Sequence, residues 1–479
     1  MLVIANLKLS MPYYLLVSLV LIIIISTHYV YADDFFEGPG VSAAEILRGR
    51  GFIADELYVE TNSGYVLRLT RGRNPLIKGG SLRSKDPVLF IHGVLASANN
   101  FLLYSQGAEP RDFTNMSLVD MDLDELIERL ADEPSAKSLP LLALNCGHEV
   151  WLLDRRGVPG SQQLIGDSRS IKTRPDQDED SSQFGSILGY INNLFSGYSF
   201  VDQFRLTLDQ RYWNYSLDEQ ARDDFPVTID FILDNSPGAS RVSVVGHSAG
   251  GAITLMALSL YPNELTSKIS SCILWSPAYA TGNDNPGFIS TFEILLPIGS
   301  AITGPLPPPF LTIPAQTTLM LICSPPPTWT TLCKEFVDAQ AGDSGGQQPA
   351  KPFLFASEYF SSSSHELVQL GQNINYPNKT VHAYDYGEAG NQAAYGQPTP
   401  PAYDLSVLTE FSSMSFYAGG TDTLVTPADV EQARAQLRVP SEYHKINTTF
   451  NHVGYFSHVD APRLAIIPSM RELETLARK

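Results

Sequence analysis

Residues 241–251 read R-V-S-V-V-G-H-S-A-G-G. Their β-branched residues predict a strand, and the apolar run at 252–258 predicts a helix directly after it. Between them, residues 246–250 fit G-x-S-x-G, the pattern of a sharp strand-to-helix turn that exposes a serine hydroxyl. Glycines two positions before and two after the serine leave room for that strained turn. The pattern predicts that Ser248 is a nucleophile, the alternative being an ordinary glycine-rich turn with a buried serine.

Strands and helices alternate on both sides of this stretch. A hairpin is expected around residues 62–64, and a capping box at Ser216–Glu219 precedes a helix that leads to residues 241–251. The other expected strands are residues 87–91, 149–154, 271–277, 413–419 and 443–446, with helices at 43–51 and 427–437. Such alternation predicts a mostly parallel sheet with helices on both faces, typical of the α/β-hydrolase fold.

The predicted domain organisation is a hydrolase core interrupted by a cap. The expected parts are a signal peptide at 1–32, a first core part at 33–278 with polar insertions near 104–140 and 161–209, a cap or lid insertion at 279–405, and a last core part at 406–479. The cap is rich in proline and lacks the regular spacing of a sheet. Within it, the apolar stretch Phe292–Cys323 is the candidate lid, the alternative being plain packing of the cap.

Composition sets limits on the class of protein. At 479 residues and 43% hydrophobic, the chain can bury a large core, and its formal net charge of −19 argues against a nucleic-acid partner. The apolar run 13–25, preceded by Lys8 and followed by Val30-Tyr31-Ala32, predicts a cleaved signal peptide. The alternative is an uncleaved membrane anchor, although the run is shorter than the roughly 20 residues that span a bilayer. We expect no stable transmembrane anchor after cleavage, and the oligomeric state is left open.

Entry into the secretory pathway gives other signals a meaning. Four sequences fit the glycosylation acceptor pattern, at Asn115, Asn214, Asn378 and Asn447. They suit a secreted or lysosomal glycoprotein. Of the four cysteines, Cys323 and Cys333 are the pair close in sequence, and a disulfide between them would contribute roughly 3 kcal/mol. Cys146 and Cys272 lie in apolar runs, so buried free thiols are predicted there.

A serine nucleophile needs a histidine to take its proton and a carboxylate to orient that histidine. In this fold the chain order is serine, acid, histidine. Asp422 is the predicted acid because it follows a strand and a glycine pair, although it could instead cap the next helix, and Asp429 is the weaker candidate. His452 is the predicted base because it directly follows an expected strand and precedes Val453-Gly454. His458 and His444 are the alternatives.

The remaining requirement is a site for the oxyanion. Two backbone N–H donors are needed, one from the residue after the nucleophile and one from the loop after the first long strand. These predict Ala249 for the first and Val94 for the second, with Leu95 as the alternative to Val94. The sequence has no metal-ligand spacing and no phosphate-binding glycine loop, so hydrolysis without a cofactor is predicted.

Eight segments together resemble the acid lipase family of gastric and lysosomal lipases. In order they are the hairpin region 51–69, HGVLAS at 92–97, GHEVWLLDRRG at 147–157, FPVTIDFIL at 225–233, GHSAGG at 246–251, VHAYDYG at 381–387, GGTDTLVTPADV at 419–430 and FNHVGYFSHVDAP at 450–462. The resemblance implies a triad at Ser248, Asp422 and His452, a lid over the site, and triacylglycerols or sterol esters as substrates. Two departures are Ala249, where the family usually has glutamine, and Asp154-Arg155-Arg156-Gly157, where it usually has Asn-Ser-Arg-Gly.

The prediction is therefore a secreted or lysosomal serine lipase that acts on lipid substrate at a lipid–water interface. One alternative is a serine carboxylesterase for other lipids or soluble esters. The other is a non-catalytic lipid-binding glycoprotein, which an intact triad disfavours.

Overall fold

The structure is a computed structural model of the chain. It describes residues 41–77, 85–165, 209–279, 281–282, 305, 334–335, 338, 341–343, 345, 362–374, 376, 380–446 and 448–477. Several predictions fall outside these residues: the signal peptide, most of the insertion at 161–209, nearly all of the candidate lid, the Cys323–Cys333 disulfide, and the acceptors Asn378 and Asn447.

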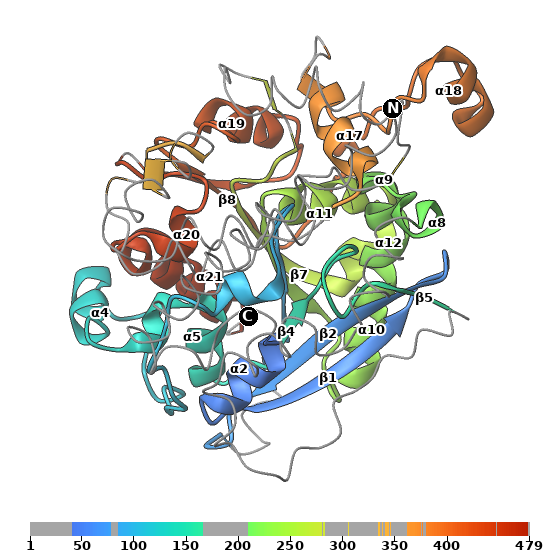
Figure 1. Cartoon of the computed structure of the whole chain (residues 1–479). Coiled ribbons are helices and arrows are strands. Elements are labelled where there is room, and N and C mark those ends of the chain that lie inside the picture. Colours follow the sequence, from blue (N-terminus) through green and yellow to red (C-terminus); the bar gives the residue numbers. More distant parts are fainter. Residues whose placement is uncertain are drawn as a thin grey trace, which may run out of the picture.

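Among the described residues, nine strands form one twisted sheet through the middle of the molecule (Figure 1). Their order is β1-β2-β4-β3-β6-β7-β8-β9, with β5 beside β2. The strands are β1 Ile53–Glu60, β2 Tyr65–Arg73, β3 Val88–Ile91, β4 Val150–Leu153, β5 Gln163–Leu164, β6 Val242–His247, β7 Ile269–Trp275, β8 Met414–Gly419 and β9 Glu442–Ile446. Every pairing from β4 across to β9 is parallel, whereas β2 runs antiparallel to β1, β4 and β5. The predicted hairpin and the mostly parallel sheet are confirmed.

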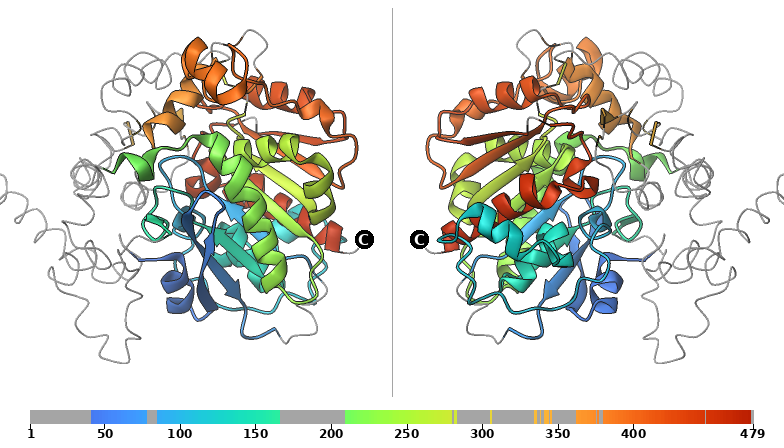
Figure 2. Two further views of the ribbon diagram at one scale, coloured as in Figure 1. Left: turned by 90° about the vertical axis from the view of Figure 1, so that its right-hand side faces the viewer. Right: turned by 90° about the vertical axis from the view of Figure 1, so that its left-hand side faces the viewer.

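Side chains alternate between the two faces of the sheet, and each face has its own core. On β3, Leu89 and Ile91 join one core while Val88 and Phe90 join the other. Helices cover both faces, as the two side views in Figure 2 show. The first core is covered by α10 Phe225–Asn235, α11 Ala249–Leu260, α12 Pro262–Lys268 and α19 Pro427–Ala435, and the second by α2 Ala43–Gly49, α4 Leu123–Arg129, α5 Leu139–Asn145 and α21 Ile467–Ala477.

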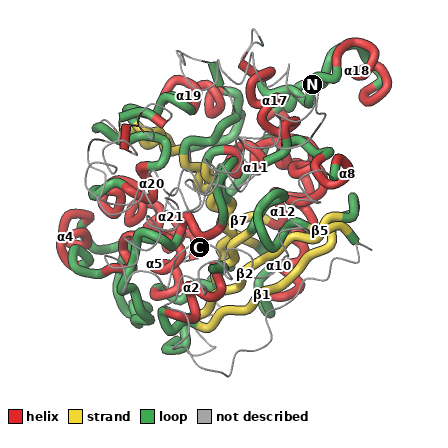
Figure 3. The backbone as a smooth tube through the Cα atoms, viewed as in Figure 1, coloured by secondary structure: helices red, strands yellow, loops and turns green. Residues whose placement is uncertain are grey.

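Short helices and turns fill the connections (Figure 3). They are η2 Ala98–Phe101, η3 Pro134–Lys137, α8 Gln210–Trp213, α9 Leu217–Glu219, a π-helical turn η5 Gln220–Asp224, α17 Ser364–Ile374, α18 Gly387–Tyr395, η7 Leu405–Val407, α20 Gly454–Ser457 and a π-helical turn η8 Pro462–Ile466. The predicted capping box is confirmed, because the Ser216 and Glu219 side chains each accept a backbone N–H of the other residue. Since α9, η5 and α10 are continuous, this box begins the path to β6.

Residues 104–140 are more structured than a polar insertion would be. They contain α4 and η3, and they place Leu118, Leu126 and Leu130 in the second core. The many charged residues of this stretch hide the pattern, because they occupy exposed positions of short helices whose leucines point inward.

Two further findings concern individual predictions. Cys146 and Cys272 are buried free thiols, as predicted, and burial raises the pKa of both. Within the described ranges, every helix is too short or too polar to cross a bilayer.

Candidate active site

Ser248 occupies the turn between β6 and α11. Its backbone angles are φ 55° and ψ −121°, a conformation that costs a non-glycine residue about 1–3 kcal/mol and that persists only when the surroundings enforce it. Here the Ser248 N–H donates to the Trp275 carbonyl at 2.9 Å, and the Ser248 carbonyl accepts from Ala252 at 3.1 Å and Ala278 at 3.0 Å. The strained turn therefore lies at the carboxyl end of the central strand β6, with the hydroxyl at the sheet edge.

The glycines around Ser248 are required by close backbone contacts. A Cβ at Gly250 would lie 2.2 Å from the Ile91 carbonyl oxygen, and a Cβ at Gly246 would lie 2.8 Å from Gly251. The steric reason predicted for the two pattern glycines is confirmed. The Gly250 contact holds the start of α11 against the end of β3. The Gly246 contact holds it against β6, the strand that precedes it.

We expect Gly250→Ala to destabilise the protein by about 3 kcal/mol or more, since the clash is with backbone that no rotamer change can relieve. Gly64→Ala is the matched control: Gly64 has φ +86° but open space around it, so only conformational strain of about 1–2 kcal/mol is expected there. Urea unfolding of the two variants would measure both values. Equal losses at the two positions would contradict the steric explanation.

The candidate acid and base lie together. Asp422 follows β8 and His452 precedes α20, and His452 Nδ1 is 2.8 Å from Asp422 Oδ2. The other carboxylate oxygen, Oδ1, accepts the backbone N–H groups of Leu424 at 2.9 Å and Val425 at 2.8 Å. Both side chains are buried. This arrangement places the proton of a neutral His452 on Nδ1 and leaves Nε2 able to accept one.

His452 is held against the turn that carries Ser248. His247, the residue before the serine, donates from Nε2 to the His452 carbonyl at 2.9 Å, and the two rings lie 4.8 Å apart. Burial, and then the nearness of His452, hold the pKa of His247 well below its usual value, so this donor stays neutral. Among the described contacts neither Ser248 Oγ nor His452 Nε2 has a hydrogen bond. Catalytic hydrogen bonds of this kind often form only when substrate is bound.

The structure places the alternative residues elsewhere. Asp429 accepts the N–H of Thr426 in the capping box of α19. His458 packs on Phe450, and its Nδ1 accepts the N–H of Asp460. His444 lies on β9 between Glu442 and Glu472. The expectation that His452 directly follows a strand is wrong, because β9 ends at Ile446 and a loop follows.

The loop after β3, residues 92–97, runs beside the serine and is called the oxyanion loop below. A Cβ at Gly93 would lie 2.9 Å from Ser248 Cβ and 3.3 Å from its Oγ, so the loop passes against the hydroxyl. Val94, the predicted second donor, follows at once, and Ala249, the predicted first donor, begins α11. Leu95 has φ 56°, a left-handed conformation that a leucine rarely adopts.

Two residues that sequence reasoning did not select organise this loop. His92 Nδ1 lies 2.7 Å from the Gly93 carbonyl and Nε2 accepts the N–H of Arg155 at 3.0 Å. Burial, and then the positive charge of Arg155, lower the pKa of His92 to about 3, so the ring is neutral with its proton on Nδ1. Asp154 accepts the N–H of Ala98 at 3.1 Å and pairs with Arg68 at 2.6 Å. The signal for both was the H-G pair after β3 and the D-R-R-G run after β4.

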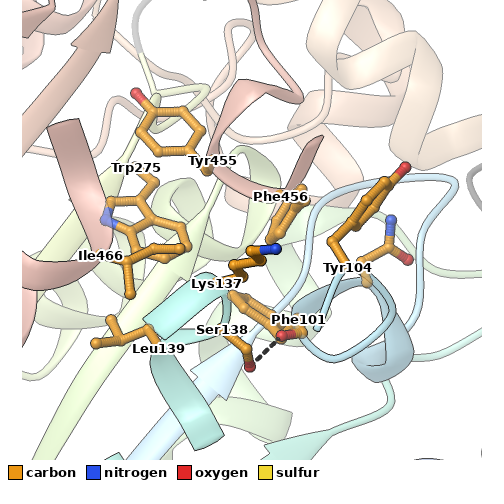
Figure 4. A pocket seen from close by; sticks show the side chains of 10 residues that line it. Phe101, Tyr104, Lys137, Ser138, Leu139, Trp275, Tyr455, Phe456 and Ile466 are labelled. Carbon is orange, nitrogen blue, oxygen red and sulfur yellow. Dashed lines mark hydrogen bonds between the residues drawn. The ribbon is translucent and has the colours of Figure 1, made fainter. Parts of the chain in front are cut away.

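A small pocket is lined mostly by side chains of the second core (Figure 4). Its lining includes Phe101, Trp275, Tyr455 and Phe456, with Lys137 at one side. Phe456 contacts the His247 ring at 4.8 Å. The pocket has no room even for a water molecule, so it does not serve as the substrate site.

Two of the predicted acceptor asparagines can be placed. Asn115 and Asn214 are both exposed. Their glycosylation stays a prediction.

Residues 86–294 match a family described as the alpha/beta hydrolase fold, and residues 43–105 match a partial alpha/beta-hydrolase lipase region. The chain is similar to lipase member N of Homo sapiens, at 27% identity over 88% of each chain. It is also similar to the gastric triacylglycerol lipase of Rattus norvegicus, at 25% identity over 89% of this chain and 91% of the relative. Among solved structures it is similar to a soluble variant of monoglyceride lipase from Saccharomyces cerevisiae, with a TM-score of 0.44, 12% identity, and coverage of 88% of this chain and 95% of the other.

Proposed function

We propose that this chain is an α/β-hydrolase of the acid lipase type and cleaves the ester bonds of neutral lipids through an acyl-enzyme on Ser248. That the chain is a lipase-type ester hydrolase follows from its relatives. The triad and the substrate class are the proposal. Its main support is the Asp422–His452 pair at 2.8 Å, held by His247 beside the strained turn of Ser248.

The mechanism follows from the protonation states that the contacts favour. His452 Nε2 takes the proton of the Ser248 hydroxyl as Oγ attacks the ester carbonyl carbon. The oxyanion that forms accepts hydrogen bonds from the N–H groups of Ala249 and Val94. The C–O bond to the alcohol then breaks, and His452 returns its proton to the leaving alcohol. His452 Nε2 takes a proton from water as the water attacks the acyl carbonyl carbon. The bond to Ser248 Oγ then breaks, His452 returns that proton to Oγ, and the fatty acid is released.

The substrate class is argued from the relatives and from the cap. We propose triacylglycerols or sterol esters at a lipid–water interface, because one relative is a gastric triacylglycerol lipase and the chain has a long insertion between β7 and β8. We also propose that the protein enters the secretory pathway, from the apolar N-terminal run and the acceptor asparagines.

One experiment tests activity and substrate together. A lipid-like phosphonate is expected to label Ser248 in the whole protein, and labelled sites then give the active fraction. Per active site, we expect faster hydrolysis of emulsified long-chain triacylglycerol or sterol ester than of a short soluble ester, and a rate that rises when an interface forms. Preference for the soluble ester would favour a carboxylesterase. Absence of labelling and of ester turnover would leave only lipid binding without catalysis.

A further inference from the structure

A buried ion pair joins the end of β4 to α17. Arg155 Nη2 contacts Glu366 Oε1, and the two side chains are only 3% and 2% exposed. The rest of the guanidinium is also paired, because Nε donates to Gln220 Oε1 at 3.0 Å and Nη1 donates to the His92 carbonyl at 3.4 Å. Each nitrogen of this buried cation therefore has its own acceptor. The His92 carbonyl belongs to the oxyanion loop, and Glu366 belongs to α17.

The oxyanion loop needs such support because its backbone is strained. Leu95 keeps a left-handed conformation, and a residue held in this way persists only where contacts enforce it. Arg155 holds the start of the loop twice, with its backbone N–H on His92 Nε2 and its side chain on the His92 carbonyl. Further along, Val94 and Leu95 pack against the buried cluster of Leu367, Val368 and Tyr384.

Helix α17 is docked by one polar face. Glu366 and Gln369, one turn apart, both point into the core. Gln369 Oε1 accepts the N–H of Leu217 at 2.9 Å, and its Nε2 donates to Asp218 Oδ1 at 2.6 Å. The Glu366 carboxylate also accepts the hydroxyl of Ser362. The ion pair of Glu366 with Arg155 thus positions α17. The same helix carries Leu367 and Val368, which pack against the oxyanion loop.

From these contacts we propose that Arg155 is a positioning residue for the oxyanion donor Val94, and that Glu366 acts through Arg155 to couple α17 to the oxyanion loop. The inference rests on the proposed function, since Val94 matters only if an oxyanion forms. It concerns a position at which this chain departs from the serine usual in the resembling family. A planar guanidinium can reach Gln220, His92 and Glu366 at once, which a shorter hydroxyl or a single ammonium cannot do.

The test uses variants that leave no buried charge unpaired. The double variant Arg155→Gln/Glu366→Gln removes both charges. In Arg155→Lys the ion pair with Glu366 can persist, but the lysine cannot also reach Gln220 and the His92 carbonyl. For both, we expect kcat on a soluble ester to fall about tenfold to 100-fold per phosphonate-titrated site, with KM within twofold. The matched control is Arg71→Gln/Glu149→Gln, which removes a 2.6 Å ion pair between β2 and the residue before β4, far from the loop. Its melting temperature should fall while kcat per site stays within twofold.

The outcomes separate the inference from the proposed function. If the unmodified protein takes up phosphonate at Ser248 but the double variant keeps its kcat per site, Arg155 is only structural and the inference is overturned. Should the double variant fail to fold, Arg155→Lys decides by the same kcat criterion. A rise in KM with unchanged kcat also overturns the inference. If the unmodified protein is neither labelled nor active, the proposed function has failed instead.

Discussion

Replacing Ser248 by alanine is expected to lower kcat for ester hydrolysis by about 10⁶-fold, with the fold intact. The reason is chemical: without the hydroxyl no acyl-enzyme forms, and His452 alone cannot offer the same nucleophile. The side chain is small and makes no described hydrogen bond, so its removal leaves no buried polar partner behind. Stopped-flow or pH-stat rates, with circular dichroism for folding, would measure the effect.

Two further variants sharpen this result. Adding His452→Ala to Ser248→Ala should lower kcat almost no further, since the two residues act as one unit in catalysis. Ser259→Ala is the control on the same helix, because its hydroxyl donates only to the Met256 carbonyl on the partly buried side of α11. It should keep full activity. Ester turnover that survives Ser248→Ala would show that another group is the nucleophile.

Asp422→Asn should lower kcat about 10⁴-fold while changing the volume of the side chain very little. The structure says how. One oxygen of Asp422 accepts two backbone N–H groups, so the amide oxygen of asparagine must remain there and the NH₂ group must face His452 Nδ1. The imidazole then accepts at Nδ1 and carries its proton on Nε2. In that tautomer it cannot take the proton of Ser248.

Asp429→Asn is the matched control for this prediction. Asp429 is also buried and lies seven residues further along, but its carboxylate accepts the N–H of Thr426 in the capping box of α19. We expect a loss of stability of about 1 kcal/mol there and unchanged kcat. NMR of the His452 ring nitrogens would report the tautomer directly in Asp422→Asn. A proton still on Nδ1, or a kcat near that of the unmodified protein, would contradict the orienting role.

The sequence predicted the parts of the fold that depend on local patterns. Strands β3, β4, β6 and β7 are buried on both faces, so each reads as an apolar run, and the turn at Ser248 needs glycines at fixed positions. Asp422 and His452 could be selected because the order of the three residues follows from the order of the strands that carry them.

What the sequence could not predict depends on contacts between distant segments. Arg155 and Glu366 are 211 residues apart, and nothing near Glu366 marks it as the partner of a buried arginine. The role of His92 was missed because its neutral state depends on burial and on Arg155. The pattern of residues 104–140 predicts a polar insertion because single buried leucines among charged residues give no sustained period.

The outer strand of the sheet also bears on how this protein behaves at high concentration. β9 lies at the end of the strand order and contains only five residues, Glu442–Ile446. Glu442 and Lys445 on it are exposed, and His444 adds a third ionisable group. A short strand with such side chains is a poor template for adding a strand from another molecule. At this end, the described part of the sheet therefore disfavours fibril-like association.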